Sequence, residues 1–475
     1  MRPPSSTSEG GLFDSVLARG RVAAEVSDRA WLQAMLDVEA ALARAQARAG
    51  LLPAEDAEAI ARACDAGRFD PAEIGAEAAK TGNPAAPLVK ALTAAVEGKA
   101  AGHVHRGATS QDVIDSAAML VAHRALGPLL DDLDGAARAA AALAAEHRDT
   151  VMAGRTLLQQ ALPVTFGLKA AEWLAGLDDA AARLEELRRS RLAAQLGGAA
   201  GTLASLGGAG PEVLAAFAEE LGLCEPALAW HTIRVRPGEL AGGLGVACGV
   251  VAKVARDVTL MAQTEVGEVR EGVPGRGGSS TLPQKRNPVA AVSAVACAMR
   301  APGLVAELLG AMAHEHERAA GPWHAEWRPF GALLEATGSA CAWLRDCLEH
   351  LEVDAVRMRA NLELTHGALL AERVTTALAP AIGRQPAHEL VQEAAQRAFA
   401  RERPLREVLT DDDRVRQHLD AEEVGALLDP AQYLGATGEL IDRALRGHAE
   451  RTGQGASLST LGEGADPQRR ETPWA

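Results

Sequence analysis

Composition limits the fold of this chain more than any other feature, because alanine is its most frequent residue and aromatic side chains make up only 3%. Alanine has the highest helix propensity, whereas strands favour β-branched and aromatic side chains that alternate with polar ones. Few such alternating runs occur along the 475 residues. The sequence therefore predicts an all-α fold.

Apolar residues recur at helical spacing in several long segments. A helix is expected over 28–49, with one apolar face made by Trp31, Met35, Val38, Leu42 and Ala45. A second helix is expected at 54–65 and an irregular loop at 82–88. The longest stretch without an internal proline, 237–269, would extend about 50 Å as a helix. Its glycines weaken an isolated helix and indicate close approach by neighbouring helices: Gly242, Gly243, Gly245 and Gly249.

Three blocks precede a polar tail. They are interpreted as an N-terminal helical domain at 1–106, a central long-helix bundle at 107–351 and a small C-terminal helical domain at 352–448. Residues 449–475 are rich in Gly, Ser, Gln and Arg and are expected to be disordered. The apolar faces of these helices are larger than one chain obviously covers. The remaining apolar surface must therefore be buried in some other contact.

The charge balance and the termini exclude several classes of protein. A net charge of −15 argues against nucleic acid as the main partner, although basic residues gathered in a pocket still allow a small anionic substrate. Residues 1–11 lack the apolar core of a signal peptide, and no long uncharged apolar stretch predicts a membrane span. The six cysteines lack metal-ligand spacing, and a chain this long builds its core without disulfides. Reduced thiols and a cytoplasmic location are therefore expected.

The segment 277–288 reads Gly-Gly-Ser-Ser-Thr-Leu-Pro-Gln-Lys-Arg-Asn-Pro and joins hydroxyls, two cations and a helix start. Asn287 is expected to be the N-cap and Pro288 the first helical residue. The positive end of that helix, with Lys285 and Arg286, would favour an anion and help a serine lose its proton. The alternative is a Gly/Ser linker, but linkers rarely carry such a sequence directly into an apolar helix.

A second polar segment, 105–112, reads His-Arg-Gly-Ala-Thr-Ser-Gln-Asp. It places His105 and Arg106 just before a helix that Thr109 or Ser110 can cap, and carboxylates suit such a positive helix end. Taken alone, the segment favours a plain N-cap followed by an amphipathic helix over a binding site. In the same way, His231 taken alone fits a structural hydrogen-bonding residue, and Arg318 fits a solvated charged face.

The segment 277–288 resembles the Gly-Ser-Ser-x-Met-Pro-x-Lys-x-Asn-Pro signature of the fumarase/aspartase superfamily, with Leu282 in place of methionine. The superfamily includes argininosuccinate and adenylosuccinate lyases. The resemblance implies a three-domain, all-α fold whose long central helices associate into a homotetramer with active sites shared between subunits. It also implies that Ser279 is the catalytic base and that Lys285 and Asn287 bind a substrate carboxylate.

The resemblance extends to further site residues. Segment 105–112 matches the motif His-x-Gly-x-Thr-Ser-x-Asp, which binds substrate through its Thr-Ser pair, here Thr109 and Ser110. On the same ground, His231 is a second catalytic candidate. The remaining substrate-binding candidates are His105, Arg106, Gln159 and Arg318.

Leu157 departs from the superfamily pattern in a chemically informative way. Many members have a histidine here that acts as a general acid or assists one, and leucine cannot transfer a proton. A departing amine or nucleotide needs a proton, whereas a carboxylate, with an ordinary pKa of about 4, does not. The substitution therefore disfavours adenylosuccinate-type and argininosuccinate-type cleavage.

With an apolar residue at position 157, the chain resembles one branch of the superfamily, the bacterial 3-carboxy-cis,cis-muconate cycloisomerases, which have a bulky apolar residue there. The likeness covers roughly 12–446 and implies reversible lactonisation of 3-carboxy-cis,cis-muconate to a carboxymuconolactone in aromatic catabolism, with no metal or organic cofactor. The alternative enzyme is a lyase that releases fumarate from a succinate with a weakly basic leaving group. A structural or ligand-binding relative without activity is the alternative outside the enzymes, and the intact Ser279, Lys285 and Asn287 argue against it.

Overall fold

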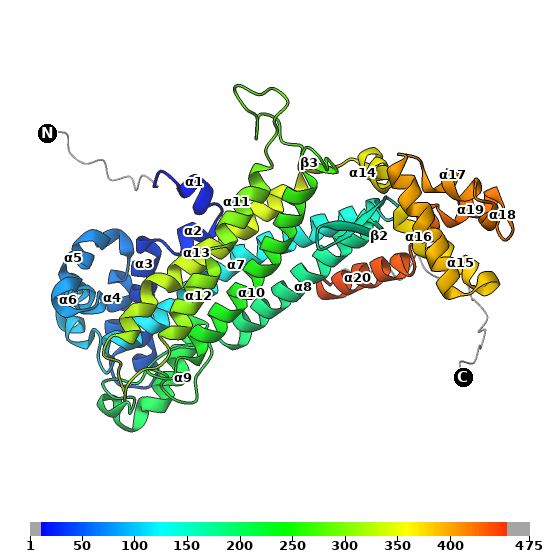
Figure 1. Cartoon of the computed structure of the whole chain (residues 1–475). Helices are drawn as coiled ribbons and strands as arrows, with labels where there is room; N and C mark the ends of the chain where they lie inside the picture. Colours follow the sequence, from blue (N-terminus) through cyan, green and yellow to red (C-terminus); the bar gives the residue numbers. More distant parts are fainter. Residues whose placement is uncertain (1–10, 454–475) are drawn as a thin grey trace, which may run out of the picture. The chain divides into compact units, whose positions relative to one another are not determined.

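The computed structural model describes residues 11–453 and is helical over most of that range, which confirms the predicted all-α class (Figure 1). The chain divides into two compact units. The first comprises the residues up to Ala136, Asp179–Thr259 and Val273–His350, and the second comprises Ala137–Asp178, Leu260–Gly272 and the residues from Leu351 onward. The boundaries fall within or beside the long helices α7 (Ser110–Glu146), α8 (Phe166–Ser190) and α10 (Val235–Met261).

The first unit contains further helices of very different length. They are α1 (Asp14–Leu17), α2 (Val22–Glu25), α3 (Asp28–Arg48), α4 (Ala54–Ala63), α5 (Pro71–Thr81), α6 (Ala85–Ala95), α9 (Gly210–Leu221), α11 (Val289–Ala298), α12 (Ala301–Gly310) and α13 (Pro322–Glu349). The predicted helix at 28–49 is confirmed to within one residue, because the Ser27 hydroxyl accepts the N–H of Ala30 and fixes its start. The predicted loop at 82–88 is wrong in its second half. The Asn83 side chain accepts the N–H groups of Ala85 and Ala86, so α6 already begins at Ala85.

Helix α10 corresponds to the long helix predicted at 237–269 but is shorter. It starts at Val235 and ends at Met261, and its 27 residues span about 40 Å. The expected close approach of neighbouring helices is confirmed at Gly243, where a Cβ would lie 2.5 Å from a methyl carbon of Leu187. Gly242 and Gly249 have no such neighbour within 4 Å, so this chain does not cover that side of α10.

All six cysteines are free and most are buried. Burial raises the pKa of the Cys64 thiol to about 12 and that of Cys248 to about 11. The two thiols therefore stay protonated at neutral pH and act as small apolar core groups.

Two helical segments are long and apolar enough to cross a bilayer by length and composition alone. Buried core helices pass the same test, and Ser110–Glu146 is such a helix, since 72% of its most apolar window is buried. The second segment, Val289–Gly310, contains α11 and α12 and is only 39% buried. It therefore leaves an apolar face uncovered by its own chain.

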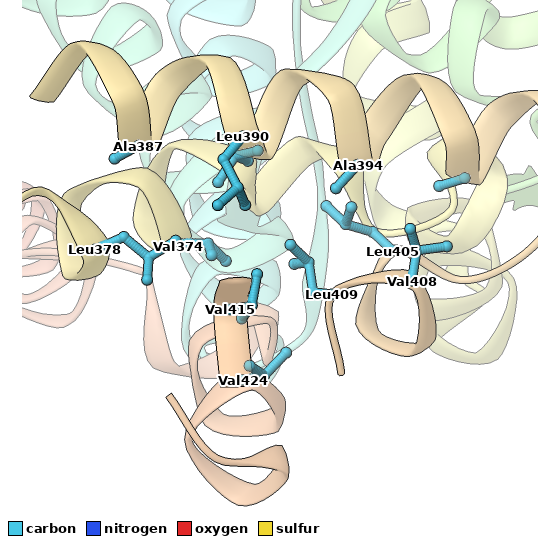
Figure 2. Close-up of a cluster of buried hydrophobic side chains, with 12 residues drawn as sticks. Val374, Leu378, Ala387, Leu390, Ala394, Leu405, Val408, Leu409, Val415 and Val424 are labelled. Atoms are coloured by element: carbon cyan, nitrogen blue, oxygen red, sulfur yellow. The ribbon is translucent and has the colours of Figure 1, made fainter. Parts of the chain in front are cut away.

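The second unit contains two short antiparallel strand pairs, which the composition did not predict. β1 (Val151–Thr156) pairs with β2 (Gln159–Thr165), and β3 (Val269–Glu271) pairs with β4 (Leu351–Val353). Its further helices are α14 (Ala355–Leu362), α15 (Ala371–Ile382), α16 (Arg384–Ala400), α17 (Leu405–Thr410), α18 (Asp413–Arg416), α19 (Ala421–Leu427) and α20 (Thr437–Arg451). In the C-terminal part of this unit, apolar side chains of α15 to α19 form one buried cluster that includes Val374, Leu390 and Leu409 (Figure 2).

The predicted disordered tail needs one correction at its start. Residues 449–451 are the last turn of α20, where Thr452 N–H still donates to the His448 carbonyl. Residues 454–475, like residues 1–10 at the other end, lie outside the described residues.

Candidate active site

The residues that the sequence predicted for the site lie in three places. One group surrounds the first turn of α7, a second lies in the loop that precedes α11, and Gln159 lies in the β1–β2 hairpin of the second unit. Each place is built by different local contacts.

The first group is organised by Asp112, whose side chain is only 1% exposed. Its carboxylate accepts the backbone N–H groups of Thr109, Gly197 and Gly198, each at 2.9 Å. It also lies 2.7 Å from Nε2 of His231, which is 4% exposed. Because a carboxylate accepts hydrogen bonds, Nε2 of His231 donates in this contact.

Arg318 joins this group through its guanidinium. Nη1 donates to Gln111 Oε1 at 3.0 Å, and Nη2 donates to the carbonyl of Ala199 at 2.9 Å. Gln111 in turn donates to the carbonyl of His231 at 2.8 Å. Thr109, Ser110, His231 and Arg318, which the sequence proposed separately, are therefore brought together at the start of α7.

His105 lies just ahead of this helix start, in a left-handed backbone conformation with φ of 58°. Its Nδ1 is 2.6 Å from Oε1 of the buried Glu39. Burial alone would lower the pKa of His105, but the hydrogen bond to Glu39 and its charge outweigh burial and raise that pKa. A protonated His105 suits the predicted role of binding a carboxylate.

Arg106 and the residues beneath the helix start serve to hold the local structure. The Arg106 guanidinium donates to the carbonyl of Leu51 at 2.8 Å. Further inside, Arg234 lies between the carboxylates of Asp115 and Glu326 at 2.7 and 2.6 Å, and all three side chains are almost fully buried. This triad joins α7, the start of α10 and α13, which fixes helix α7 with Asp112 and the segment before α10 with His231.

The second group is the Ser279 loop, which we define as residues 277–287. It begins and ends at a narrow neck, where the N–H and the side-chain amide of Asn287 both donate to the Gly277 carbonyl at 2.8 and 3.0 Å. Within the loop, the Ser279 hydroxyl oxygen accepts the N–H groups of Thr281 and Leu282 at 3.3 and 3.1 Å. Two amides directed at one oxygen favour negative charge on it, which suits a serine that takes part in proton transfer.

The predicted cap of the following helix is wrong by one residue. Helix α11 begins at Val289, its N-cap is Pro288, and no side chain caps it. The Asn287 side chain instead donates its amide N–H to the Gly277 carbonyl and closes the neck of the Ser279 loop. Lys285 and Asn287 nevertheless lie in the same exposed loop as Ser279, as predicted.

The Ser279 loop and the Asp112 group lie at opposite ends of the Val289–Gly310 segment. Asn287 immediately precedes this segment, whereas Ile233, two residues beyond His231, pairs with Ala313 just after it. Twenty-two helical residues span about 30 Å. Figure 1 shows the loop at the far end of α11 and α12 from the turns near α9. One chain therefore does not bring Ser279 to His231.

The third place is the tip of the β1–β2 hairpin, where Thr156 pairs with Gln159 across a two-residue turn. The turn residues Leu157 and Leu158 both have positive φ, and they are 98% and 73% exposed. Such a turn normally contains Asn-Gly, because other residues are strained in it. Gln159 is exposed beside it at the start of β2.

Sequence reasoning missed several residues that shape the site. Asp112 was matched as part of a motif, but only its position in that motif hinted at a role. Gly197 and Gly198 give no sequence signal, and Glu39 was read only as part of a helix. Among residues 11–453, no group of three or more His, Cys, Asp and Glu side chains is arranged to hold a metal ion.

Comparisons with known proteins agree with this arrangement. The chain matches a family model described as "Lyase" over residues 17–303 and one described as "Adenylosuccinate lyase C-terminus" over 367–444. It is 50% identical over 444 residues to a 3-carboxy-cis,cis-muconate cycloisomerase of Bradyrhizobium diazoefficiens, which covers 93% of this chain and 98% of that protein. It is 44% identical over 451 residues to a nitrosuccinate lyase of Streptomyces davaonensis, with 92% and 95% covered.

Solved structures give the same result. The crystal structure of a 3-carboxy-cis,cis-muconate lactonizing enzyme from Pseudomonas putida matches with a TM-score of 0.88 at 44% identity, and the match covers 93% of this chain and 99% of that chain. The helix arrangement is thus that of a known lactonizing enzyme. The chain belongs to the lyase family, the fumarase/aspartase superfamily that its motifs resemble.

Proposed function

We propose that this protein interconverts 3-carboxy-cis,cis-muconate and a carboxymuconolactone. The observation that carries the proposal is the 50% identity to a cycloisomerase over nearly the whole length of both chains. In the lactonising direction, a substrate carboxylate oxygen forms a bond to one carbon of a conjugated double bond, and a proton is added to the neighbouring carbon. In reverse, a base removes the proton alpha to a carboxylate while the carbon–oxygen bond breaks.

The proposed roles follow from the geometry of each group. Ser279 transfers the proton, because two backbone amides are directed at its hydroxyl oxygen. Lys285 and Asn287 bind a carboxylate from the same loop, while Thr109, Ser110 and a protonated His105 bind one from the start of α7. Fixed donors that meet developing charge supply most of the rate enhancement in such reactions. The reacting groups belong to one molecule, so the site mainly has to fix its conformation.

Leu157 supports a reaction that needs no acid for the leaving group. The side chain is fully exposed at the tip of the hairpin and cannot donate a proton. In the ring-opening direction the leaving group is a carboxylate, which departs as an anion.

A second candidate shares this property, namely the release of fumarate from a succinate with a weakly basic leaving group. The 44% identity to a nitrosuccinate lyase favours it, because nitrite, like a carboxylate, leaves without a proton. The two candidates predict different spectra with different substrates.

Ultraviolet absorbance separates the two candidates and tests Ser279. With 3-carboxy-cis,cis-muconate, we expect loss of the conjugated-diene band, whereas nitrosuccinate or another substituted succinate would give a rising fumarate band in the second case. Ser279→Ala should lower kcat by about 100-fold or more. Ser280→Ala is the matched control and should retain activity. Full turnover by Ser279→Ala would exclude the serine as the base.

We further propose a homotetramer with shared active sites, which the exposed apolar face of α11 and α12 supports. Six of the exposed residues recur at alternating spacings of four and three, the pattern by which helices pack against other helices: Val292, Ala296, Met299, Gly303, Ala306 and Gly310. The separation of Ser279 from His231 within one chain supports sharing as well. Ala296→Glu should break the assembly, and light scattering after size-exclusion chromatography would measure the loss. A cytoplasmic location, consistent with six free cysteines, completes the proposal.

A further inference from the structure

The base of the Ser279 loop is attached to α13 through an ion pair. Arg276, one residue before the loop, places Nη1 2.6 Å from Oδ2 of Asp346. Both side chains are largely buried, with 18% and 13% of their surface exposed. A charge-assisted hydrogen bond in such a place is stronger than one at the open surface.

Asp346 is itself held by two other side chains. Arg19 Nη2 lies 2.8 Å from Oδ2, and His350 Nδ1 lies 3.0 Å from Oδ1. The Arg19 guanidinium also stacks on the Trp343 ring, with 3.8 Å to the ring centroid. The carboxylate that receives Arg276 is therefore fixed from three directions, and it provides a rigid anchor.

The loop has little else to orient it within its own chain. Among the described residues, the hydrogen bonds of residues 278–286 join loop residues to one another, such as Lys285 N–H to the Leu282 carbonyl and the Gly278–Arg286 bridge. These bonds fix the internal shape of the loop but not its direction. The direction is set at its two ends, which are Arg276 on one side and the start of α11 on the other.

We propose that Asp346 is a positioning residue that orients the Ser279 loop through Arg276. The inference rests on the proposed role of Ser279 in proton transfer, and it adds a residue that does not contact the substrate. Loss of the anchor would leave the neck and the fold intact but let the loop sample other directions. The rate of the chemical step would then fall, because a reacting group loses its geometry.

Limited proteolysis tests the anchor without any substrate. Trypsin can cut after Lys285 and Arg286, and mass spectrometry identifies those cuts among all others. Arg276→Gln should speed these cuts about tenfold relative to the wild type, and Arg276→Lys should fall between the two. Arg300→Gln is the matched control. Arg300 pairs with Glu335 of α13, the helix that also carries Asp346, but not with the loop. Equal cutting in Arg276→Gln and the wild type would overturn the proposal.

Kinetics test the consequence for the reaction. Asp346→Asn and Arg276→Gln should each lower kcat about tenfold with a smaller change in KM, and Arg276→Lys should recover part of kcat. Arg276→Gln leaves Asp346 paired with Arg19 and His350, so it should fold and melt like the wild type even if Asp346→Asn does not. An unchanged kcat in a variant with faster loop cutting would overturn the positioning role. Absence of wild-type activity on every substrate would instead count against the proposed function, while the proteolysis result would still decide the anchor.

Discussion

At the scale of single residues, buried carboxylates decide what the histidines of the site can do. Asp112 contacts Nε2 of His231 and thereby fixes the orientation of the imidazole ring. Glu39 instead pairs with Nδ1 of His105 and favours its protonated form. The two histidines thus differ in the ring nitrogen that faces a carboxylate, and both carboxylates lie far from them in the sequence.

Glu39→Gln tests the second of these pairs. The pKa of His105 is raised in the folded protein, so the stabilisation from the pair is fully present below the ordinary value of 6.5 and is lost as pH rises through the folded value. We expect the variant to be less stable than the wild type by about 1–2 kcal/mol in the acidic part of this range, with a smaller difference at higher pH. Urea unfolding of both proteins at a series of pH values measures this difference in the free energy of unfolding. A difference that stays constant with pH would count against a charged His105.

At the scale of elements, the Ser279 loop depends on its neck. Gly277 has φ of 75°, and a Cβ at this position would lie 2.2 Å from the Asn287 carbonyl oxygen. No side chain fits there without opening the neck. The loop therefore needs glycine at this position for a steric reason, and flexibility is not required to explain it.

Gly277→Ala should consequently open the neck and reduce activity by about 100-fold, while the melting temperature changes little because the loop is exposed. Gly278→Ala is the matched control, since its Cβ would have no neighbour within 4 Å. Steady-state kinetics and thermal unfolding of the two variants give the comparison. Similar losses of activity in both variants would show that the neck is not the cause.

Element boundaries show where sequence patterns were sufficient. The helix at 28–49 was predicted because its apolar period and its cap are both local. The start of α11 was misplaced because the Asn287 side chain bonds to Gly277, ten residues earlier, and no local pattern reveals that choice. The β3–β4 pair was missed because it is short and joins the distant segments 269–271 and 351–353. The β1–β2 hairpin was missed because its turn is Leu157-Leu158 and not a usual turn sequence such as Asn-Gly.

At the scale of the whole molecule, an active site that contains both Ser279 and His231 requires more than one chain. Mixing two inactive variants tests this directly. Ser279→Ala and His231→Gln should each have little activity, but subunits exchanged between them should regain about a quarter of the wild-type activity, because random mixing restores both residues in about that share of sites. Ser279→Ala mixed with Lys285→Ala is the control, since both changes lie in one loop. No recovery in the first mixture would contradict shared sites.

The sequence by itself determined the helical class, the course of the main helices and the motifs that contain the site residues. These depend on local properties, namely propensity and the repeat of apolar residues along a helix. Only the tertiary structure decided which residues meet: Asp112 with Gly197 and His231, 85 and 119 positions away, or Arg276 with Asp346. The domain boundaries at 106 and 351 stay a prediction. Contacts across such distances depend on how helices pack, and helical periodicity carries no information about the partner that a buried polar group will find.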